Sequence, residues 1–395
     1  MKILILSEFV EGYTDGASSR VRYRTALKIA ESGHDVTFIY PSGNSKYRAY
    51  KDDSERLTVY LTPGILPSKF RSGGFGIIDT IFKCVMVLKY DYDAIQVTNG
   101  HRPAQFLPAV IGKYFKQAVI VDECWEWLGK GGYADSRKGF FGKIVSLYDA
   151  LFELRLKRYF DEIITISSAL KERFKEKDNV TVLYGGAEND LLIDYDIKHA
   201  RSELGLEQNA FILGMSNVCP SDHDDNVVFF TALKKIMQQN GNVFLLLTGT
   251  DKNYINEIGL TQLYSDRIIF PGWTTFELYN KYMSSCNAFV LPFTNTIKNN
   301  GRWPNKIGDY LCLNRPIITN PTGDMMPLFT KYKIGFLCDD SEDGFYNVVT
   351  EILGRNKSLT EYHSDSIYVA RQILSFDKRV NRLLEIIEGR LDLKS

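Results

Sequence analysis

The amino-acid sequence predicts an α/β protein built from two doubly wound domains, each with a parallel sheet. Three observations lead to this prediction. The chain has 395 residues, which is more than one ordinary hydrophobic core covers and therefore favours two domains. Short apolar runs alternate with helical patterns along both halves, as expected for βαβ units. A break in this alternation at residues 185–190 (GGAEND) separates the two halves.

The first half opens with a βαβ unit. Residues 2–6 form an apolar run, a loop containing Gly16 follows, and we expect a helix from about residue 18 to residue 32 and a strand at 36–40. Ligands bind at the carboxyl ends of the strands in open α/β sheets. We therefore expect Gly16 and Arg20, which lie between the first strand and the first helix turn, to approach a bound group.

The same alternation continues to the end of the chain. We place the domain boundary after residue 188, with a second domain at 189–365 and a C-terminal helical segment at 366–395. The remaining expected strands are 57–61, 94–97, 118–121, 162–166, 180–183, 211–214, 243–247, 267–270, 288–291, 316–319 and 335–337, and the expected helices are 77–88, 103–115, 167–177, 226–239, 275–286 and 304–313.

The composition excludes several classes of protein. Hydrophobic residues make up 44% of the chain and charged residues 24%, which is typical of a globular protein. The formal net charge is zero, which argues against bulk nucleic-acid binding. The six cysteines are scattered without CxxC spacing, so we expect reduced core residues and no zinc site. We find no signal peptide or spanning segment and expect a cytoplasmic protein.

Acidic and aromatic residues gather where the strand at 118–121 ends. Residues 121–132 read VDECWEWLGKGG, and charged groups at such a strand end are costly unless they serve a cleft. We expect Asp122, Glu123 and Glu126 to bond sugar-like hydroxyls or to act as a general base, and Trp125 or Trp127 to stack on a sugar ring. The alternative is a pair of buried tryptophans with capping acids. The glycines of this segment predict a loop that can move as a lid.

Residues 137–160 combine basic and aromatic side chains in an amphipathic pattern. Such a segment can lie on an anionic membrane surface, which would place the protein on the inner face of the membrane. It can equally be an ordinary helix of the domain, because Asp149 and Glu153 dilute its positive charge.

Residues 301–320 contain the most informative motif. Pro304 marks a helix start, and Lys306 falls in the first turn, where a cation is unfavourable unless an anion is bound. Asp309 lies on the same face of the helix, where a carboxylate can accept hydrogen bonds from a ribose. A phosphate-and-ribose ligand, and so a nucleotide, satisfies both groups. The alternative is a surface pair of Lys306 and Asp309.

Four segments taken together resemble the GT-B-fold glycosyltransferases, and family 4 in particular. They are 33–36 (GHDV), 161–170 (DEIITISSAL), 267–273 (RIIFPGW) and 304–319 (PNKIGDYLCLNRPIIT). The resemblance implies two Rossmann-like domains that face each other across a cleft, with a C-terminal helix crossing back to the first domain. It also implies a nucleotide-sugar donor on the second domain, an acceptor on the first, and metal-independent transfer with retention of configuration.

The resemblance also implies roles for individual residues. Asp309 matches the acid that holds the ribose, Lys306 is placed for the diphosphate, the segment 271–273 corresponds to the base-binding strand end, and Gly16 to the loop near the diphosphate. The predicted donor-binding residues are Gly16, Arg20, Asn217, Gly249, Gly272, Trp273, Asn300, Asn305 and Asp309, and the predicted catalytic residues are Asp122, Glu126, Arg302 and Lys306. No metal site and no cofactor are expected.

The sequence departs from the family pattern at three places. Gly301 stands where the family has its first acid, so Asn299, Asn300 or Arg302 would contact the sugar instead. Residues 215–226 lack the family's Arg and Lys, and residues 122–126 lack its histidine. We therefore expect a glycosyltransferase that acts on a surface-glycan or lipid-linked acceptor. A GT-B sugar-nucleotide epimerase and a non-catalytic GT-B scaffold subunit remain as alternatives.

Overall fold

The computed structural model describes residues 1–8, 17–42, 47–51, 55–63, 73–250, 252–260, 264–354 and 359–394, and leaves the side chains of residues 17–20 and 221 undescribed. The chain forms two compact units. The first comprises Met1–Tyr184, Gly301–Trp303 and Asp377–Ser395, and the second comprises Gly185–Asn300 and Pro304–Phe376. The units thus change at residues 184 and 376, where we expected changes at 188 and 365.

The first unit contains an eight-stranded sheet in the order β3-β4-β2-β1-β5-β6-β7-β8. Neighbouring strands are parallel, except that β3 and β4 are antiparallel. Residues 3–6 of β1 are at most 2% exposed, as expected for a central strand covered on both faces. The strands are β1 (Lys2–Leu6), β2 (Asp35–Pro41), β3 (Arg48–Lys51), β4 (Leu57–Thr62), β5 (Ala94–Thr98), β6 (Val119–Cys124), β7 (Glu162–Thr165) and β8 (Val180–Val182).

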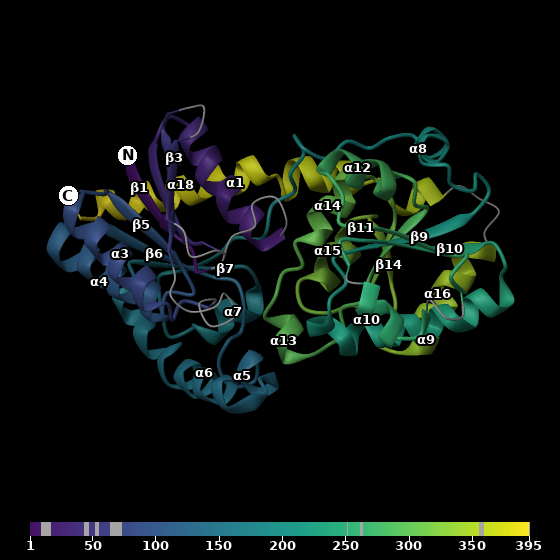
Figure 1. Ribbon diagram of the computed structural model, residues 1–395, viewed down its shortest axis with the longest axis horizontal. Coiled ribbons are helices and arrows are strands. Elements are labelled where there is room, and N and C mark those ends of the chain that lie inside the picture. The colour runs from purple at the N-terminus through teal and green to yellow at the C-terminus, as the bar shows by residue number, and fades with distance from the viewer. Residues whose placement is uncertain are drawn as a thin grey trace. The chain divides into compact units, whose positions relative to one another are not determined.

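Helices cover both faces of this sheet. Figure 1 shows α18, in yellow, beside α1, and shows α3, α4 and α6 on the other side of the sheet. The helices of this unit are α1 (Ala17–Glu31), α3 (Ile77–Lys89), α4 (Pro103–Lys116), α5 (Tyr133–Ser136), α6 (Gly139–Phe152), α7 (Ser168–Arg173) and α18 (Phe376–Asp392).

The C-terminal helix is tied to the first sheet by ion pairs. Arg379 of α18 pairs with the buried Glu123 of β6. Arg390 Nη2 lies 2.5 Å from an oxygen of Glu162 on β7, which is also buried. Because a buried carboxylate without a partner is costly, these pairs fix α18 against the first unit.

The second unit contains a six-stranded parallel sheet in the order β11-β10-β9-β12-β13-β14. Its strands are β9 (Phe211–Ser216), β10 (Val243–Thr248), β11 (Ile268–Gly272), β12 (Ala288–Leu291), β13 (Ile317–Thr319) and β14 (Gly335–Leu337). Its helices are α8 (Ile197–Leu204), α9 (His223–Gln239), α10 (Lys252–Glu257), α12 (Phe276–Ser284), α13 (Ile297–Asn300), α14 (Lys306–Cys312), α15 (Met325–Lys331), α16 (Glu342–Gly354) and α17 (Ser366–Tyr368).

Both sheets reverse their strand order at one point. The reversal falls between β1 and β5 in the first unit and between β9 and β12 in the second. In doubly wound sheets the ligand crevice lies at such a reversal, outside the carboxyl ends of the strands. The predicted α/β class and its two Rossmann-like sheets are therefore confirmed. In the part of the chain that the structure describes, no helix is long and apolar enough to span a membrane.

Candidate functional site

In the second unit, the residues that follow β9, β10 and β11 meet at the carboxyl edge of the sheet. The backbone N–H of Asn217 donates to Thr248 O at 2.8 Å, and that of Gly249 donates to Gly272 O at 2.8 Å. Gly249 has φ +60°, and a Cβ atom there would lie 2.5 Å from Oδ1 of Asn217. A side chain at residue 249 would therefore displace the Asn217 amide.

Helix α14 brings Lys306 to the same edge. The Nζ of Lys306 donates to the backbone oxygen of Asn217 at 3.0 Å. One turn further on, the Tyr279 hydroxyl donates to Asp309 Oδ2 at 3.4 Å, and Asp309 is half-buried. The next residue, Tyr310, is fully buried and places its hydroxyl 3.0 Å from the N–H of Ser216 at the end of β9. This contact fixes the position of α14 against β9.

The other predicted donor residues of this unit differ in their exposure and in whether their polar atoms already have hydrogen-bond partners. Trp273 is 65% exposed, and its ring would lie 3.5 Å from a Cβ on Gly249. The Oδ1 atom of Asn305 is buried without a hydrogen-bond partner among the described residues. The Asn300 amide, in contrast, donates to Asn295 Oδ1 and Thr296 O, at 2.7 and 2.9 Å, within its own turn.

Asp122, one of the predicted catalytic residues, lies in the core of the first unit. The side chain is completely buried and forms an ion pair with Lys157, itself 1% exposed. Its other oxygen accepts a hydrogen bond from the Gly100 N–H at 2.8 Å. Asp122 therefore neutralises a buried lysine and fixes the turn after β5, and its side chain is not accessible to a ligand.

Hydrogen bonds and close packing hold the loop after β6, which was predicted to move as a lid. The N–H groups of Leu128 and Gly129 both donate to Glu153, at 3.0 Å each. A Cβ atom on Gly132 would lie 1.9 Å from the backbone oxygen of Trp127, so this glycine serves close packing. Arg173 covers the Trp127 ring at 4.3 Å, which leaves that face unavailable to a sugar.

Glu126 and Arg302 belong to a group of charged side chains at the strand reversal of the first unit. We call this group the arginine cluster. Its members follow β1, β5 and β6 or lie on adjoining helices and loops. They are Glu8, Arg22, Arg102, Glu126, Arg137, Asp149 and Arg302.

Hydrogen bonds hold the members of the arginine cluster in place. Arg102 Nη2 and Arg137 Nη1 donate to the same oxygen of Asp149, at 2.7 and 2.5 Å. The Asn99 amide donates to Glu8 Oε1 at 2.5 Å. Arg302 Nη1 lies 3.4 Å from the hydroxyl oxygen of Tyr133.

Burial and the arginine charges act in opposite directions on the carboxyl groups of the arginine cluster. Burial raises the pKa of Glu8 to about 7, although Arg102 and Arg22 oppose this rise. Burial likewise raises the pKa of Glu126, against the opposing charges of Arg302 and the other three arginines. Burial alone would also raise the pKa of Asp149, but its hydrogen bond with His101 and its arginine partners hold that pKa below the usual value.

Two of the predicted residues cannot be placed. Gly16 lies outside the described residues, and the side chain of Arg20, on the first turn of α1, is also outside them. Within the described ranges, no group of three or more His, Cys, Asp or Glu side chains could hold a metal ion.

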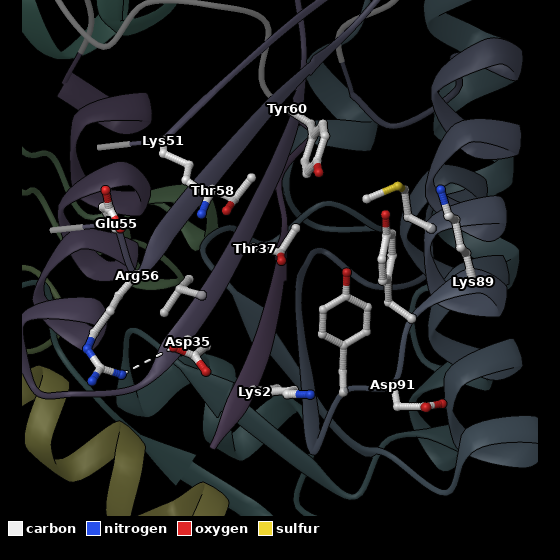
Figure 2. A pocket seen from close by; sticks show the side chains of 14 residues that line it. Lys2, Asp35, Thr37, Lys51, Glu55, Arg56, Thr58, Tyr60, Lys89 and Asp91 are labelled. Atoms are coloured by element: carbon white, nitrogen blue, oxygen red, sulfur yellow. Dashed lines mark hydrogen bonds and ion pairs between the residues drawn. The ribbon is translucent and has the colours of Figure 1, made fainter. Parts of the chain in front are cut away.

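A separate pocket lies at the opposite edge of the first sheet, at the amino ends of β1, β2 and β4. Figure 2 shows Lys2, Thr37 and Tyr60 pointing into it, with the ion pair of Arg56 and Asp35 at its rim. Its volume is about 530 Å³. None of the predicted site residues lines it, and ligands of doubly wound sheets bind at the other edge.

Comparison with known proteins connects this geometry to a function. Residues 210–355 match the family model described as "Glycosyl transferases group 1". Apart from residues 301–303, this range lies inside the second unit, and it contains all of that unit's predicted donor residues. The chain has the GT-B fold, and residues 210–355 match a glycosyltransferase family. The resemblance seen in the sequence is thereby confirmed at the level of the GT-B fold and group 1.

Solved glycosyltransferases share the fold over the whole chain. A sucrose-phosphate synthase from Thermosynechococcus elongatus is 15% identical and covers 100% of both chains, with a TM-score of 0.74. HepE from Anabaena in complex with UDP is 14% identical and covers 98% of this chain and 100% of its own, with a TM-score of 0.69. WaaG, a glycosyltransferase of lipopolysaccharide biosynthesis, is 12% identical and covers 98% of this chain and 100% of its own, with a TM-score of 0.68. No curated protein matches the sequence.

The sequence interpretation missed several members of the arginine cluster. Glu8, Arg22 and Arg102 had been treated as ordinary residues or left out. The signal was present for two of them, because Glu8 follows β1 and Arg102 follows β5 at the carboxyl ends where ligands bind. Arg22 gives no such signal, since its role depends on which face of α1 meets the sheet.

Proposed function

We propose that this glycosyltransferase transfers a sugar from a nucleoside diphosphate sugar to a surface-glycan or lipid-linked acceptor. The observation that carries the proposal is the convergence of Asn217, Gly249, Gly272 and Lys306 at the carboxyl edge of the second sheet. The structurally similar HepE binds UDP and UDP-glucose, which supports a donor of this class.

Each donor residue has a role that follows from its chemistry. Lys306 provides the positive charge for the diphosphate that leaves as the glycosidic bond to the donor breaks, and stabilising that charge is the main electrostatic contribution of such a site. Asp309 accepts hydrogen bonds from the ribose hydroxyls. The exposed Trp273, next to Gly272 at the end of β11, contacts the base.

We further propose that the transfer needs no metal ion and retains the anomeric configuration. Lys306 supplies the charge that a divalent cation would otherwise supply to the diphosphate. The configuration of the product's anomeric carbon, measured by NMR, tests retention. Activity that disappears in EDTA and returns with magnesium would contradict metal independence.

Helix α6 supports peripheral contact with a membrane, which is where a lipid-linked acceptor resides. Phe140, Phe141, Ile144 and Leu147 on α6 are 49% to 75% exposed. These positions recur at helical spacing and make one apolar face. The exposed cations around that face are Lys138, Lys143, Arg155 and Arg158.

The acids that seemed to dilute this positive charge lie elsewhere. Asp149 is fully buried against Arg102, and Glu153 is 3% exposed and bonded to the loop after β6. The outer face of α6 is therefore apolar and basic. Such a face suits anionic lipid headgroups, and we propose that it lies on the inner surface of the membrane.

The test of the donor site is a thermal-shift measurement on the full chain with UDP-, GDP-, ADP- and CMP-sugars, in magnesium and in EDTA. A ligand that binds the folded state raises the melting temperature by mass action. We expect one donor to raise it in both conditions and Asp309→Ala to remove the shift. The matched control, Asp343→Ala, removes an exposed carboxylate of the same unit and should leave the shift intact. The absence of a shift with every donor would overturn the proposal.

A further inference from the structure

The arginine cluster lies at the strand reversal of the first unit, whereas the donor residues belong to the second unit. Glu8, Arg102 and Glu126 follow β1, β5 and β6, which are adjacent strands in the sheet. The reversal falls between β1 and β5, which is where doubly wound sheets bind their ligands. The proposed donor function does not use this position.

Two buried polar groups at this edge have unsatisfied atoms. The Oε2 atom of Glu8 and the Nε1 atom of Trp125 are buried without hydrogen-bond partners among the described residues. The two side chains are 4% and 6% exposed. Buried polar groups are almost always hydrogen-bonded, so an unpartnered acceptor and an unpartnered donor at one strand edge indicate a missing ligand.

The arginine cluster carries more positive than negative charge. Four guanidinium groups face three carboxyl groups, and Asp149 alone accepts hydrogen bonds from both Arg102 and Arg137. Burial raises the pKa of Glu8 to about 7, so this carboxyl group carries less than a full negative charge at neutral pH, and burial also raises the pKa of Glu126. The neighbouring His101 adds no negative charge. Among the described residues, the surplus at this edge is therefore positive.

We propose that the arginine cluster binds an anionic group of the acceptor, a phosphate or a carboxylate carried by the sugar that receives the transferred residue. Arg137 and Arg302, which are half-buried, contact the anion, because planar guanidinium groups bind such oxyanions in pairs. The Oε2 atom of Glu8 accepts a hydrogen bond from a hydroxyl of the same sugar. This inference rests on the proposed function, since it assigns the substrate class of its acceptor.

The experiment is isothermal titration calorimetry on the full chain with three probes: glucose 6-phosphate, glucuronate and glucose. We expect at least one anionic probe to bind at least tenfold more tightly than glucose, and the better of the two identifies the anion as phosphate or carboxylate. Equal affinities for all three probes, or no binding of either anion, would overturn the inference.

Matched variants separate recognition of the anion from support of the fold. We expect Arg137→Gln and Arg302→Gln each to weaken anion binding about tenfold or more, and Arg302→Lys to keep most of it. The control Arg382→Gln removes an exposed arginine of α18 in the same unit and should change nothing. An Arg302→Lys variant as weak as Arg302→Gln, with unchanged melting temperatures, would contradict a role based on charge.

The donor measurement distinguishes the two proposals. A donor-induced thermal shift in the unmodified protein, together with no preference for the anionic probes, rejects only the acceptor inference. Anion binding that depends on Arg137 and Arg302, without any donor-induced shift, would reject the proposed donor while the subsite stands.

Discussion

At the scale of single residues, Glu8 makes the stability of the first unit depend on pH. Its pKa is raised to about 7 by burial, from an ordinary value of 4.5. The folded protein therefore holds a proton between these two pH values that the unfolded chain has already lost. Stability falls as pH rises through this window, by about 3 kcal/mol at most for a shift of this size.

We expect Glu8→Gln to remove this pH dependence. The variant should be more stable than the unmodified protein at pH 8 and similar to it at pH 4.5, because the amide needs no proton. Urea unfolding between pH 4.5 and 8 measures this difference. The control Glu385→Gln changes a 60% exposed carboxylate of α18 and should leave the profile unchanged. Parallel profiles for Glu8→Gln and the unmodified protein would show that Glu8 is ionised throughout.

Among the proposed donor residues, we expect turnover to depend most on Lys306. Removing one group that stabilises developing negative charge typically costs 100- to 1000-fold in rate. We expect Lys306→Ala to lose at least about 100-fold in kcat while its melting temperature stays close to that of the unmodified protein. Steady-state assays with the donor identified by thermal shift measure this loss. Lys235→Ala, at a half-exposed lysine of α9, is the control. Near-normal turnover in Lys306→Ala would remove it from the mechanism.

At the scale of secondary-structure elements, β14 depends on a glycine. Gly335 has φ +149°, and a Cβ atom there would lie 1.9 Å from the backbone oxygen of Ile317 on β13. The pairing of these two strands begins at this residue pair. We expect Gly335→Ala to destabilise the second unit by about 2 to 4 kcal/mol, because the backbone must move to admit the methyl group.

The control for this prediction is Gly241→Ala. A Cβ atom on Gly241 meets nothing within 4 Å, so the same change of residue should alter the unfolding midpoint little. Chemical denaturation followed by far-UV circular dichroism measures both variants. Equal midpoints would mean that β14 can shift without disturbing its neighbour.

The outer face of α6 predicts binding to anionic vesicles. Replacing Phe140 and Phe141 by serine removes two large apolar groups, each of which contributes about 1.5 to 3 kcal/mol when buried. We expect co-sedimentation with phosphatidylglycerol vesicles to weaken by more than about tenfold. Replacing the exposed Ile193 and Met326 of the second unit by serine is the matched control. If both double variants bind the vesicles equally well, the membrane contact does not involve the outer face of α6.

At the scale of the whole molecule, the sequence predicted the parts of the fold that depend on local pattern. The buried strands β1 and β9 are apolar runs, and the helices between them have amphipathic spacing, so both sheets could be predicted. The antiparallel strand β3 could not, because Arg48–Lys51 are all exposed and polar or small. The attachment of α18 could not either, since it depends on ion pairs between residues more than two hundred positions apart in the chain.

The part of the candidate site that could be predicted from the sequence consists of residues at the carboxyl ends of neighbouring strands in the second unit. Asn217 and Gly249 come directly after a strand and Gly272 ends one, and parallel strands bring such residues to one edge. Asp122 also stands near a strand end, yet it is buried because Lys157 reaches it from a later segment. A sequence pattern does not show which side of a strand a distant lysine will cover, so the burial of Asp122 could not be predicted.

On the ribosome, the first unit is completed only after the second unit has been synthesised. All eight strands of its sheet have been synthesised by residue 182, but Arg379 and Arg390 follow only after the whole second unit. Until then Glu123 and Glu162 lack the guanidinium groups with which they are buried in the finished protein, and a buried unpaired carboxylate is strongly unfavourable. The nascent sheet must keep these side chains hydrated, so we expect chaperones and proteases to act on it until translation ends.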